Sequence, residues 1–187
     1  VKHDLSNELC ASTPEEVAYM KKVPYASTVG SIMYAVRCTR PDVAFAQNLV
    51  SRYQQNPGKL HWVAVKHILK YLRNMRDMFL VYGGKTDIKL DVTGFCDASW
   101  QCDKDETKSQ TGYVFVVNGV VDWKSKKHTT IAMHSEQAEY VAASKAAIKA
   151  VWIRKFVGDL RVQMFPPLPM VESYPLDCYV PNQRGIV

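Results

Sequence analysis

The fold class follows from the segment Lys89-Leu-Asp-Val-Thr-Gly-Phe-Cys-Asp97-Ala-Ser-Trp100, which alternates polar with apolar residues and ends near an acid. That alternation is typical of a half-buried strand, and it places Asp97 at the strand's carboxyl end. A second segment, His134-Ser-Glu-Gln-Ala-Glu139-Tyr140, opens a long helical pattern that carries Glu139 near its start. An Asp on a strand and a Glu on a helix can converge on divalent metal ions, as metal-assisted phosphodiester hydrolysis requires.

A hairpin is predicted between these two acids. The runs Thr111 to Val117 and Val120 to Ser125 are rich in strand formers, and Asn118-Gly119 between them is a strong signal for a two-residue turn. We expect a further strand around 129–133, or a continuation of the second run past a bulge. A helix is expected from Ser135 to Leu160, with alanines dominating its middle. This half therefore predicts a three-strand antiparallel sheet with one long helix, and the residues from 174 to 180 allow a fourth strand.

The other half is predicted to be helical, which makes the chain α+β. Residues 1–23 show little periodicity and are expected to form a surface arm. Residues 24–83 have helical spacing in three stretches, ending in a short strand at 78–82 before the glycine pair at 83–84. The three helices are expected to bury the following residues: Val29, Ile32, Met33 and Val36; Val43, Ala46, Val50 and Tyr53; and Trp62, Val65, Ile68, Leu69 and Leu72.

The third of these helices is basic. From Arg52 to Arg76 the sequence has six Lys or Arg residues and no Asp or Glu. Such a face is either solvated or turned towards phosphates, each of which a Lys or Arg can neutralise. The candidate nucleic-acid-binding residues are Lys59, Lys66, Lys70, Arg73 and Arg76.

Composition sets the broader limits. A net charge of +6 over 187 residues favours a polyanionic partner. Five cysteines, an odd number without Cys-x-x-Cys spacing, indicate reduced thiols and an intracellular location in the cytoplasm or nucleus. No apolar run is long enough to span a membrane, so no membrane partner is expected. The chain starts with Val1 and is expected to be a piece of a longer polypeptide.

Several motifs, in their order along the chain, resemble the C-terminal part of copia-type retrotransposon Gag-Pol polyproteins. They are Val23-Pro-Tyr-Ala-Ser-Thr-Val-Gly-Ser-Ile-Met-Tyr34, Cys38-Thr-Arg-Pro-Asp42, Asn56-Pro-Gly-Lys59, Gly94-Phe-Cys-Asp-Ala-Ser-Trp100, Trp123-Lys-Ser-Lys-Lys127 and Ala138-Glu-Tyr140. The resemblance implies a reverse transcriptase thumb or connection segment over 24–83 and an incomplete ribonuclease H-like domain over 88–187. It also implies Mg²⁺ or Mn²⁺ as cofactor, and as partners an RNA–DNA hybrid and the rest of the polyprotein.

The resemblance assigns roles to both acids. Asp97 matches the first catalytic Asp of the ribonuclease H pattern and Glu139 its helical Glu, so both are candidate catalytic residues and metal ligands. The third catalytic Asp of the pattern falls on Val180 or Pro181, and Asp177 replaces it only if the register slips. Three hypotheses stay open: a nuclease completed by other sequence, an inactive remnant that binds nucleic acid, and a recruited partner-binding domain. The missing acid favours inactivity of this chain alone.

Overall fold

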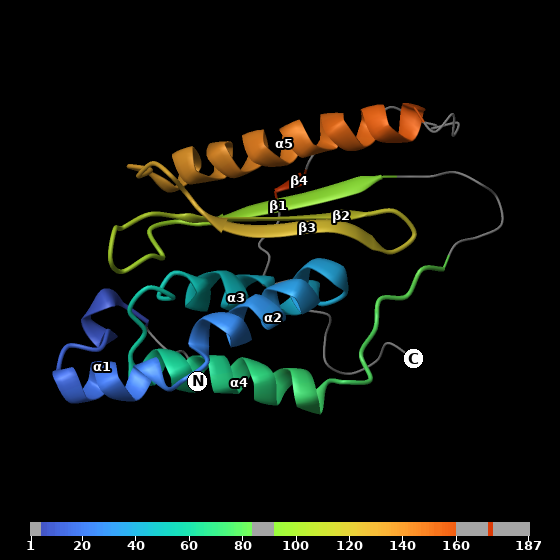
Figure 1. Cartoon of the computed structure of the whole chain (residues 1–187). Coiled ribbons are helices and arrows are strands. Elements are labelled where there is room, and N and C mark those ends of the chain that lie inside the picture. The colour runs from blue at the N-terminus through green and yellow to red at the C-terminus, as the bar shows by residue number, and fades with distance from the viewer. Residues whose placement is uncertain (1–4, 84–91, 160–171, 174–187) are drawn as a thin grey trace. The chain divides into compact units, whose positions relative to one another are not determined.

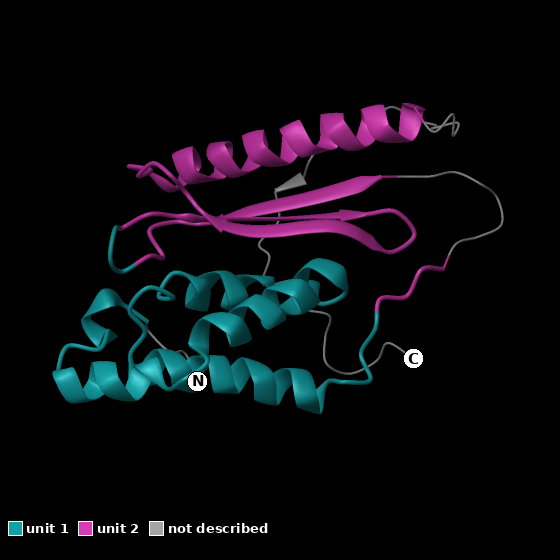
Figure 2. Ribbon diagram, viewed as in Figure 1, with its two compact units in different colours: residues 1–79, 104–106 teal, residues 80–103, 107–187 magenta. Residues whose placement is uncertain are grey.

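The computed structural model describes residues 5–83, 92–159 and 172–173. Its chain divides into two compact units, coloured separately in Figure 2: residues 1–79 with 104–106, and residues 80–103 with 107–187. The first unit is helical, and the second combines a sheet with one long helix (Figure 1). The chain is therefore α+β, as its sequence predicts.

The first unit consists of short helices. They are η1 (Asn7–Leu9), α1 (Pro14–Lys21), α2 (Tyr25–Cys38), η2 (Pro41–Val43), α3 (Ala44–Ser51) and α4 (Lys59–Asn74). The start of α1 has a proline at its first position and a cap in which Thr13 Oγ1 accepts from the Glu16 N–H at 3.2 Å. η2 also begins with a proline, Pro41, but has no side-chain cap.

The core of the first unit comes mainly from the apolar faces of α2, α3 and α4. Val29, Ile32, Val50 and Val65 are all at most 2% exposed. The predicted buried face of α4 is rotated from the observed one: Leu69 is 39% exposed, and the buried positions are His61, Ala64, Val65 and Ile68. The apolar spacing of the sequence could not reveal this rotation, because one of the buried residues is a histidine.

The amino-terminal segment is part of this core rather than the expected surface arm. Leu5, Ala11 and Met20 are each at most 7% exposed and belong to the buried cluster of the unit. Gly58 approaches the backbone of Leu9 so closely that a Cβ would collide with its carbonyl oxygen. The segment is held by such close contacts and not by any periodic apolar face, which is why its sequence suggested an arm.

His61 joins this segment to α4. Its Nδ1 accepts from the Gly58 N–H at 2.9 Å, so its Nε2 carries the proton and donates to the Ser6 carbonyl at 3.2 Å. The ring also stacks on Tyr53, with 4.0 Å between centroids. Burial lowers the pKa of His61, in keeping with a neutral ring that has one donor and one acceptor.

Arg40 closes the opposite end of α4. Its guanidinium donates twice to Asp42, at 3.0 and 2.8 Å, and its third nitrogen donates to the Met75 carbonyl at 3.2 Å. The guanidinium also lies over the Tyr71 ring, 5.7 Å from its centroid. The Arg-Pro-Asp motif therefore fixes the carboxyl end of the basic helix.

The second unit contains four strands in the order β3-β2-β1-β4, with α5 over one face (Figure 1). They are β1 (Thr93–Ser99), β2 (Gln110–Val116), β3 (Val120–Lys127) and β4 (Glu172–Ser173). The helix α5 (Ser135–Asp159) lies between β3 and β4 in the chain. The first three pair antiparallel, while β4 pairs parallel with β1. The predicted hairpin turn is confirmed, since Asn118 and Gly119 both have positive φ, 51° and 152°.

The core of the second unit is built from small residues on the helix and larger ones on the sheet. Ala138, Ala142 and Ala146 of α5 are 0% exposed, and Phe115 of β2 is 1% exposed. A Cβ on Gly94 would meet the Phe115 ring at 2.5 Å, so only glycine fits beside this ring. Ile153 is the large residue of α5 that joins this core, at 6% exposure. Most other large apolar residues of α5 lie outside: Tyr140, Ile148, Val151, Trp152 and Phe156 are each at least 50% exposed.

Two predicted strands are absent from the described structure. Residues 78–82 form no strand, and the segment is held by a side chain, through Tyr82 Oη donating to the Val120 carbonyl at 2.8 Å. Residues 129–133 also form none, because the ladder closes where the His128 N–H donates to the Ser109 carbonyl. The strand allowed at 174–180 lies outside the described residues. None of the helices described is long and apolar enough to cross a membrane.

Candidate functional site

Asp97 lies near the carboxyl end of the central strand β1, directly opposite Gly112 of β2. The strand forms because its residues alternate in burial, and Cys96, next to Asp97, is 1% exposed in the core. Neighbours on both sides hold β1 in place, so the Asp97 backbone is rigidly positioned. The opposing glycine adds no side chain beside the carboxylate.

Glu139 lies in the second turn of α5. The helix begins at Ser135, and Gln137 steadies its start by accepting from the Met133 N–H at 2.9 Å. This contact gives Gln137 a structural role at the start of the helix. Ala138, the neighbour of Glu139, is fully buried and holds this end of the helix against the rest of the unit.

The two predicted acids come together. Burial raises the pKa of Glu139, the nearby charge of Asp97 raises it further, and a hydrogen bond from the Ala98 backbone N–H partly opposes them. Since Ala98 follows Asp97 in β1, the Glu139 carboxyl group reaches the strand beside the Asp97 residue. Burial, then Glu139 and Asp97, also raise the pKa of the Cys96 thiol.

One oxygen of this pair has no protein partner. Glu139 Oε2 is buried and accepts no hydrogen bond in the structure. Buried polar atoms are normally satisfied, so an orphaned carboxylate oxygen beside a second carboxylate suits a cation. Mg²⁺ prefers such oxygen ligands and is commonly bound through one or two carboxylates and several waters.

A third protein ligand is not found in the part of the chain that the structure describes. Among residues 5–83, 92–159 and 172–173, no cluster of three or more His, Cys, Asp or Glu could hold a metal ion. Asp177, Val180 and Pro181, on which the prediction of a third acid depends, lie outside these ranges. Among the described residues, the carboxylates of Asp97 and Glu139 are therefore the oxygen donors that this end of the sheet offers.

Two other polar residues near the sheet are buried although they lie outside its strands, His128 just after β3 and Asp103 in the loop between β1 and β2. His128 is 2% exposed, contacts Thr111 Oγ1 through its Nε2, and has a pKa lowered by burial and then by Lys145. Asp103 is 3% exposed and forms an ion pair with Lys127 at 3.1 Å. Neither sequence pattern signals burial, because each depends on partners far along the chain.

The predicted nucleic-acid-binding residues lie on the outside of the first unit. Lys59, Lys66, Lys70 and Arg73 are all exposed, and at about 100° per residue they fall within about 60° of arc on α4. We call these four residues the α4 basic face. Arg76 lies beyond the helix and forms an ion pair of 3.6 Å with Asp77. The side chains of Arg76 and Asp77 are 81% and 90% exposed. Screening by water makes that pair weak.

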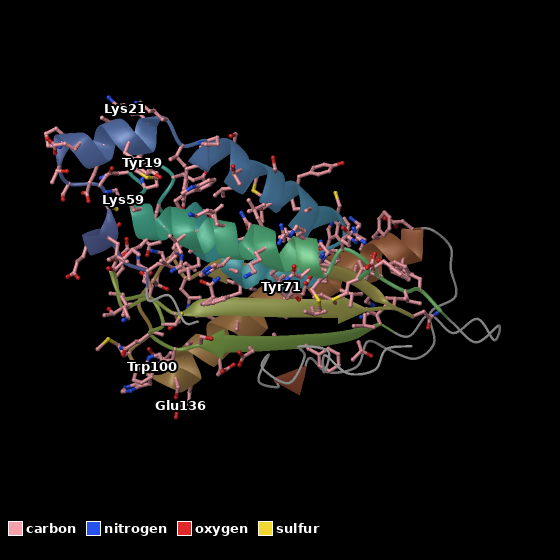
Figure 3. All side chains as sticks on the ribbon, turned by 90° about the horizontal axis from the view of Figure 1, so that it is seen from below. Tyr19, Lys21, Lys59, Tyr71, Trp100 and Glu136 are labelled. Atoms are coloured by element: carbon pink, nitrogen blue, oxygen red, sulfur yellow. The ribbon has the colours of Figure 1, made fainter. Side chains whose placement is uncertain are left out.

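An aromatic ring lies at one end of the α4 basic face. Lys59 Nζ is 5.7 Å from the centroid of the Tyr19 ring, and the two labelled side chains lie together in Figure 3. Tyr19 is 49% exposed. A ring beside a cationic face is a feature of surfaces on which bases stack while phosphates are neutralised.

Comparison with known proteins finds relatives among retroelement polyproteins. The chain is 45% identical to the "Retrovirus-related Pol polyprotein from transposon TNT 1-94" of Nicotiana tabacum over 83% of this chain and 12% of that protein. It is 33% identical to the "Retrovirus-related Pol polyprotein from transposon RE2" of Arabidopsis thaliana over 76% of this chain and 10% of that protein. It therefore spans about a tenth of these polyproteins.

A further relative has a comparable length. The "Secreted RxLR effector protein 161" of Plasmopara viticola is 42% identical over 72% of this chain and 94% of that protein. No family model matches the chain. No solved structure matches it.

Proposed function

This chain belongs to the family of retrovirus-related Pol polyproteins of copia-type transposons, and we propose that its second unit is a ribonuclease H-like metal site for RNA–DNA hybrids. The observation that carries the proposal is the meeting of Asp97 and Glu139, with a buried Glu139 oxygen that no protein group satisfies. The two acids are far apart in sequence, and the fold of the unit brings them together. If Asp97 and Glu139 had a purely structural role, their carboxylate oxygens would be paired with protein cations or hydrogen-bond donors.

In this proposal the two carboxylates hold Mg²⁺ or Mn²⁺. A bound ion of this class supplies a polarised water and neutralises charge on the phosphodiester. Asp97 provides a ligand from a fixed strand, and Glu139 provides one from the first turns of a packed helix. The raised pKa of Glu139 favours a cation, because a positive charge would relieve the repulsion from Asp97.

We propose that this chain binds hybrids but does not cleave them alone. Hydrolysis by two metal ions needs several converging carboxylates, and the described residues supply two. The α4 basic face is the proposed contact with nucleic acid, with its lysines and arginine at the phosphates. The remaining ligands would come from sequence outside the described ranges or from the rest of the polyprotein.

The test is cleavage and binding of a labelled RNA–DNA hybrid with Mg²⁺ or Mn²⁺. The expected result is binding without cleavage by the folded chain. Cleavage that is lost in Asp97→Asn would mean that a substitute third ligand, such as Asp177, completes the site. Cleavage that persists in both Asp97→Asn and Glu139→Gln would show that these acids are not the site.

Binding through the α4 basic face has its own control. Replacing Lys66, Lys70 and Arg73 with Ala should flatten the salt dependence of hybrid affinity, by up to about 0.9 in slope for each lost phosphate contact. Replacing the exposed residues Lys21, Lys22 and Lys155 with Ala removes the same charge elsewhere and should change the slope little. An equal change in both variants would mean that only net charge matters.

A second candidate function is a role outside reverse transcription, as a partner-binding domain. The observation that favours it is the alignment with 94% of a protein named as a secreted effector, which shows a relative that consists almost wholly of this region. The two candidates differ in a simple measurement. A partner-binding domain should show no salt-dependent affinity for the hybrid.

A further inference from the structure

A group of lysines gathers on the face of the second unit's sheet that α5 covers. In the antiparallel ladder, Lys124 lies opposite Tyr113 and Lys126 opposite Thr111. Residues directly opposite in such a ladder share a face of the sheet. Tyr113 packs against alanines of α5, so both lysines emerge on the face that α5 covers.

The helix α5 adds a third lysine, Lys145, to the two lysines of β3. Lys149 of α5 pairs with Asp122 of β3 at 3.6 Å, which shows that the helix passes over this strand. Lys145 lies one turn earlier, and the charges of Lys126 and Lys124 act on it after burial in lowering its pKa. We call Lys124, Lys126 and Lys145 the β3–α5 lysine cluster.

The charges around this cluster are unbalanced. The acid facing it in the described structure is Asp122, which is engaged by Lys149. His128, the other titratable neighbour, has a pKa lowered by burial and then by Lys145, which favours its neutral form, and a histidine has no negative form that could balance the lysines. Lys127, on the alternate face of β3, is instead neutralised by Asp103 at 3.1 Å.

Protection of a sheet edge does not explain the arrangement. β3 is the outer strand of the described sheet, and lysines on an edge strand commonly prevent association with other strands. That role needs charges on the strand alone, whereas Lys145 comes from the helix and is half-buried. Bringing it to two like charges opposes folding, unless an anion compensates for the repulsion.

We infer that the β3–α5 lysine cluster is a contact for the phosphate backbone of nucleic acid, separate from the α4 basic face. The inference rests on the proposed function, because it takes the hybrid as the polyanion. Lysines act as point charges at phosphates and read no sequence, so this contact would add affinity without base preference. The cluster belongs to the same unit as Asp97 and Glu139, and it would hold the nucleic-acid strand on that unit.

The experiment compares two variants of the whole chain that lose the same charge. One carries Lys124→Gln, Lys126→Gln and Lys145→Gln, and the other carries Lys21→Gln, Lys22→Gln and Lys155→Gln. Hybrid affinity is measured from low to high salt after circular dichroism has confirmed folding. The cluster variant should lose about 2 to 3 from the slope of log affinity against log salt, at about 0.9 for each contact, while the matched control stays near the wild type.

A second readout uses the unmodified protein. Acetylation of lysines by a small reagent should slow at Lys124, Lys126 and Lys145 when the hybrid is added. If the wild type binds with an unchanged slope in the cluster variant and no protection of these lysines, the inference is overturned and the proposed function stands. If the wild type does not bind the hybrid at any salt concentration, the proposed function fails and this contact fails with it.

Discussion

The two units treat their buried polar groups differently. In the first unit, Arg40 and His61 use their buried nitrogens to bridge separate segments through hydrogen bonds. Buried atoms without a hydrogen-bond partner are concentrated in the second unit, at Asp122 Oδ2, His128 Nδ1 and Glu139 Oε2. The first unit has one among its described residues, Arg52 Nε, on a guanidinium that bonds Asn48 through another nitrogen. Groups that are satisfied within the protein stabilise it, whereas groups left open are suited to a ligand.

The cores differ in the same sense. The first unit buries large side chains such as Ile32 of α2, Ile68 of α4 and Tyr53 just after α3. The second unit packs α5 mainly through alanines and Ile153 against Tyr113 and Phe115 of the sheet, and it leaves Trp152 54% exposed. A helix that packs mainly through alanines buries less apolar area for each residue, so we expect the second unit to be the less stable of the two. The comparison assigns stability to the first unit and the candidate chemistry to the second.

The largest expected effect on stability comes from removing the guanidinium of Arg40, which joins Asp42 to the end of α4. Arg40→Met should cost about 3 kcal/mol, because it removes an ion pair whose side chains are 10% and 13% exposed, together with the hydrogen bond to the Met75 carbonyl. Arg76→Met is the matched control and should cost at most about 1 kcal/mol, since its ion pair with Asp77 is exposed. Urea unfolding of both variants provides the measurement. Equal losses would remove the distinction between buried and exposed pairs in this unit.

A smaller effect tests the close packing of the second unit. Ala146→Leu should destabilise it by about 1 to 3 kcal/mol, because this residue is 0% exposed against the sheet. Ala147→Leu adds the same atoms at an exposed position of α5 and should be nearly neutral. Hydrogen exchange of the β1 and β2 amides would report the change. Tolerance of leucine at both positions would contradict the observed orientation of the helix.

The smallest effect concerns the open carboxylate. The raised pKa of Glu139 means that the folded state binds its proton more tightly than the unfolded state does, so metal-free stability falls as pH rises above the ordinary value of 4.5. Glu139→Gln should therefore raise the melting temperature at pH 7 in a chelating buffer, and the gain should vanish at pH values below 4.5.

The control for this prediction is Glu136→Gln, an exposed acid in the first turn of the same helix. It removes a charge that is favourable near a helix start, so it should not raise the melting temperature. A gain in Glu136→Gln equal to that in Glu139→Gln would show that general charge, and not the meeting with Asp97, sets the result.

Local patterns were enough to predict much of the second unit. Strand formers around Asn118-Gly119 gave the hairpin, and the alternation before Asp97 gave β1. The helix expected from Ser135 to Leu160 is observed as Ser135–Asp159. The first unit was harder, because its amino-terminal segment is held by scattered contacts of Leu5, Ala11 and Met20 that have no period.

The candidate site could be predicted only in part. Two acids were identified from their places in the sequence, but their approach depends on how α5 lies on the sheet, which no local pattern encodes. The burial of His61, His128 and Asp103 was missed for the same reason, since a polar residue is buried only where distant partners satisfy it. The β3–α5 lysine cluster likewise required the register between β2 and β3.

The most direct test of the paired acids is binding of Mn²⁺ followed by nuclear magnetic resonance. Because Mn²⁺ is paramagnetic, it broadens the signals of nearby amides at low concentration and requires no catalytic activity. The account predicts that the amides of Asp97, Ala98 and Glu139 broaden first, and that Asp97→Asn and Glu139→Gln each weaken this effect. Broadening centred elsewhere, or unchanged in both variants, would contradict a metal site at these two acids.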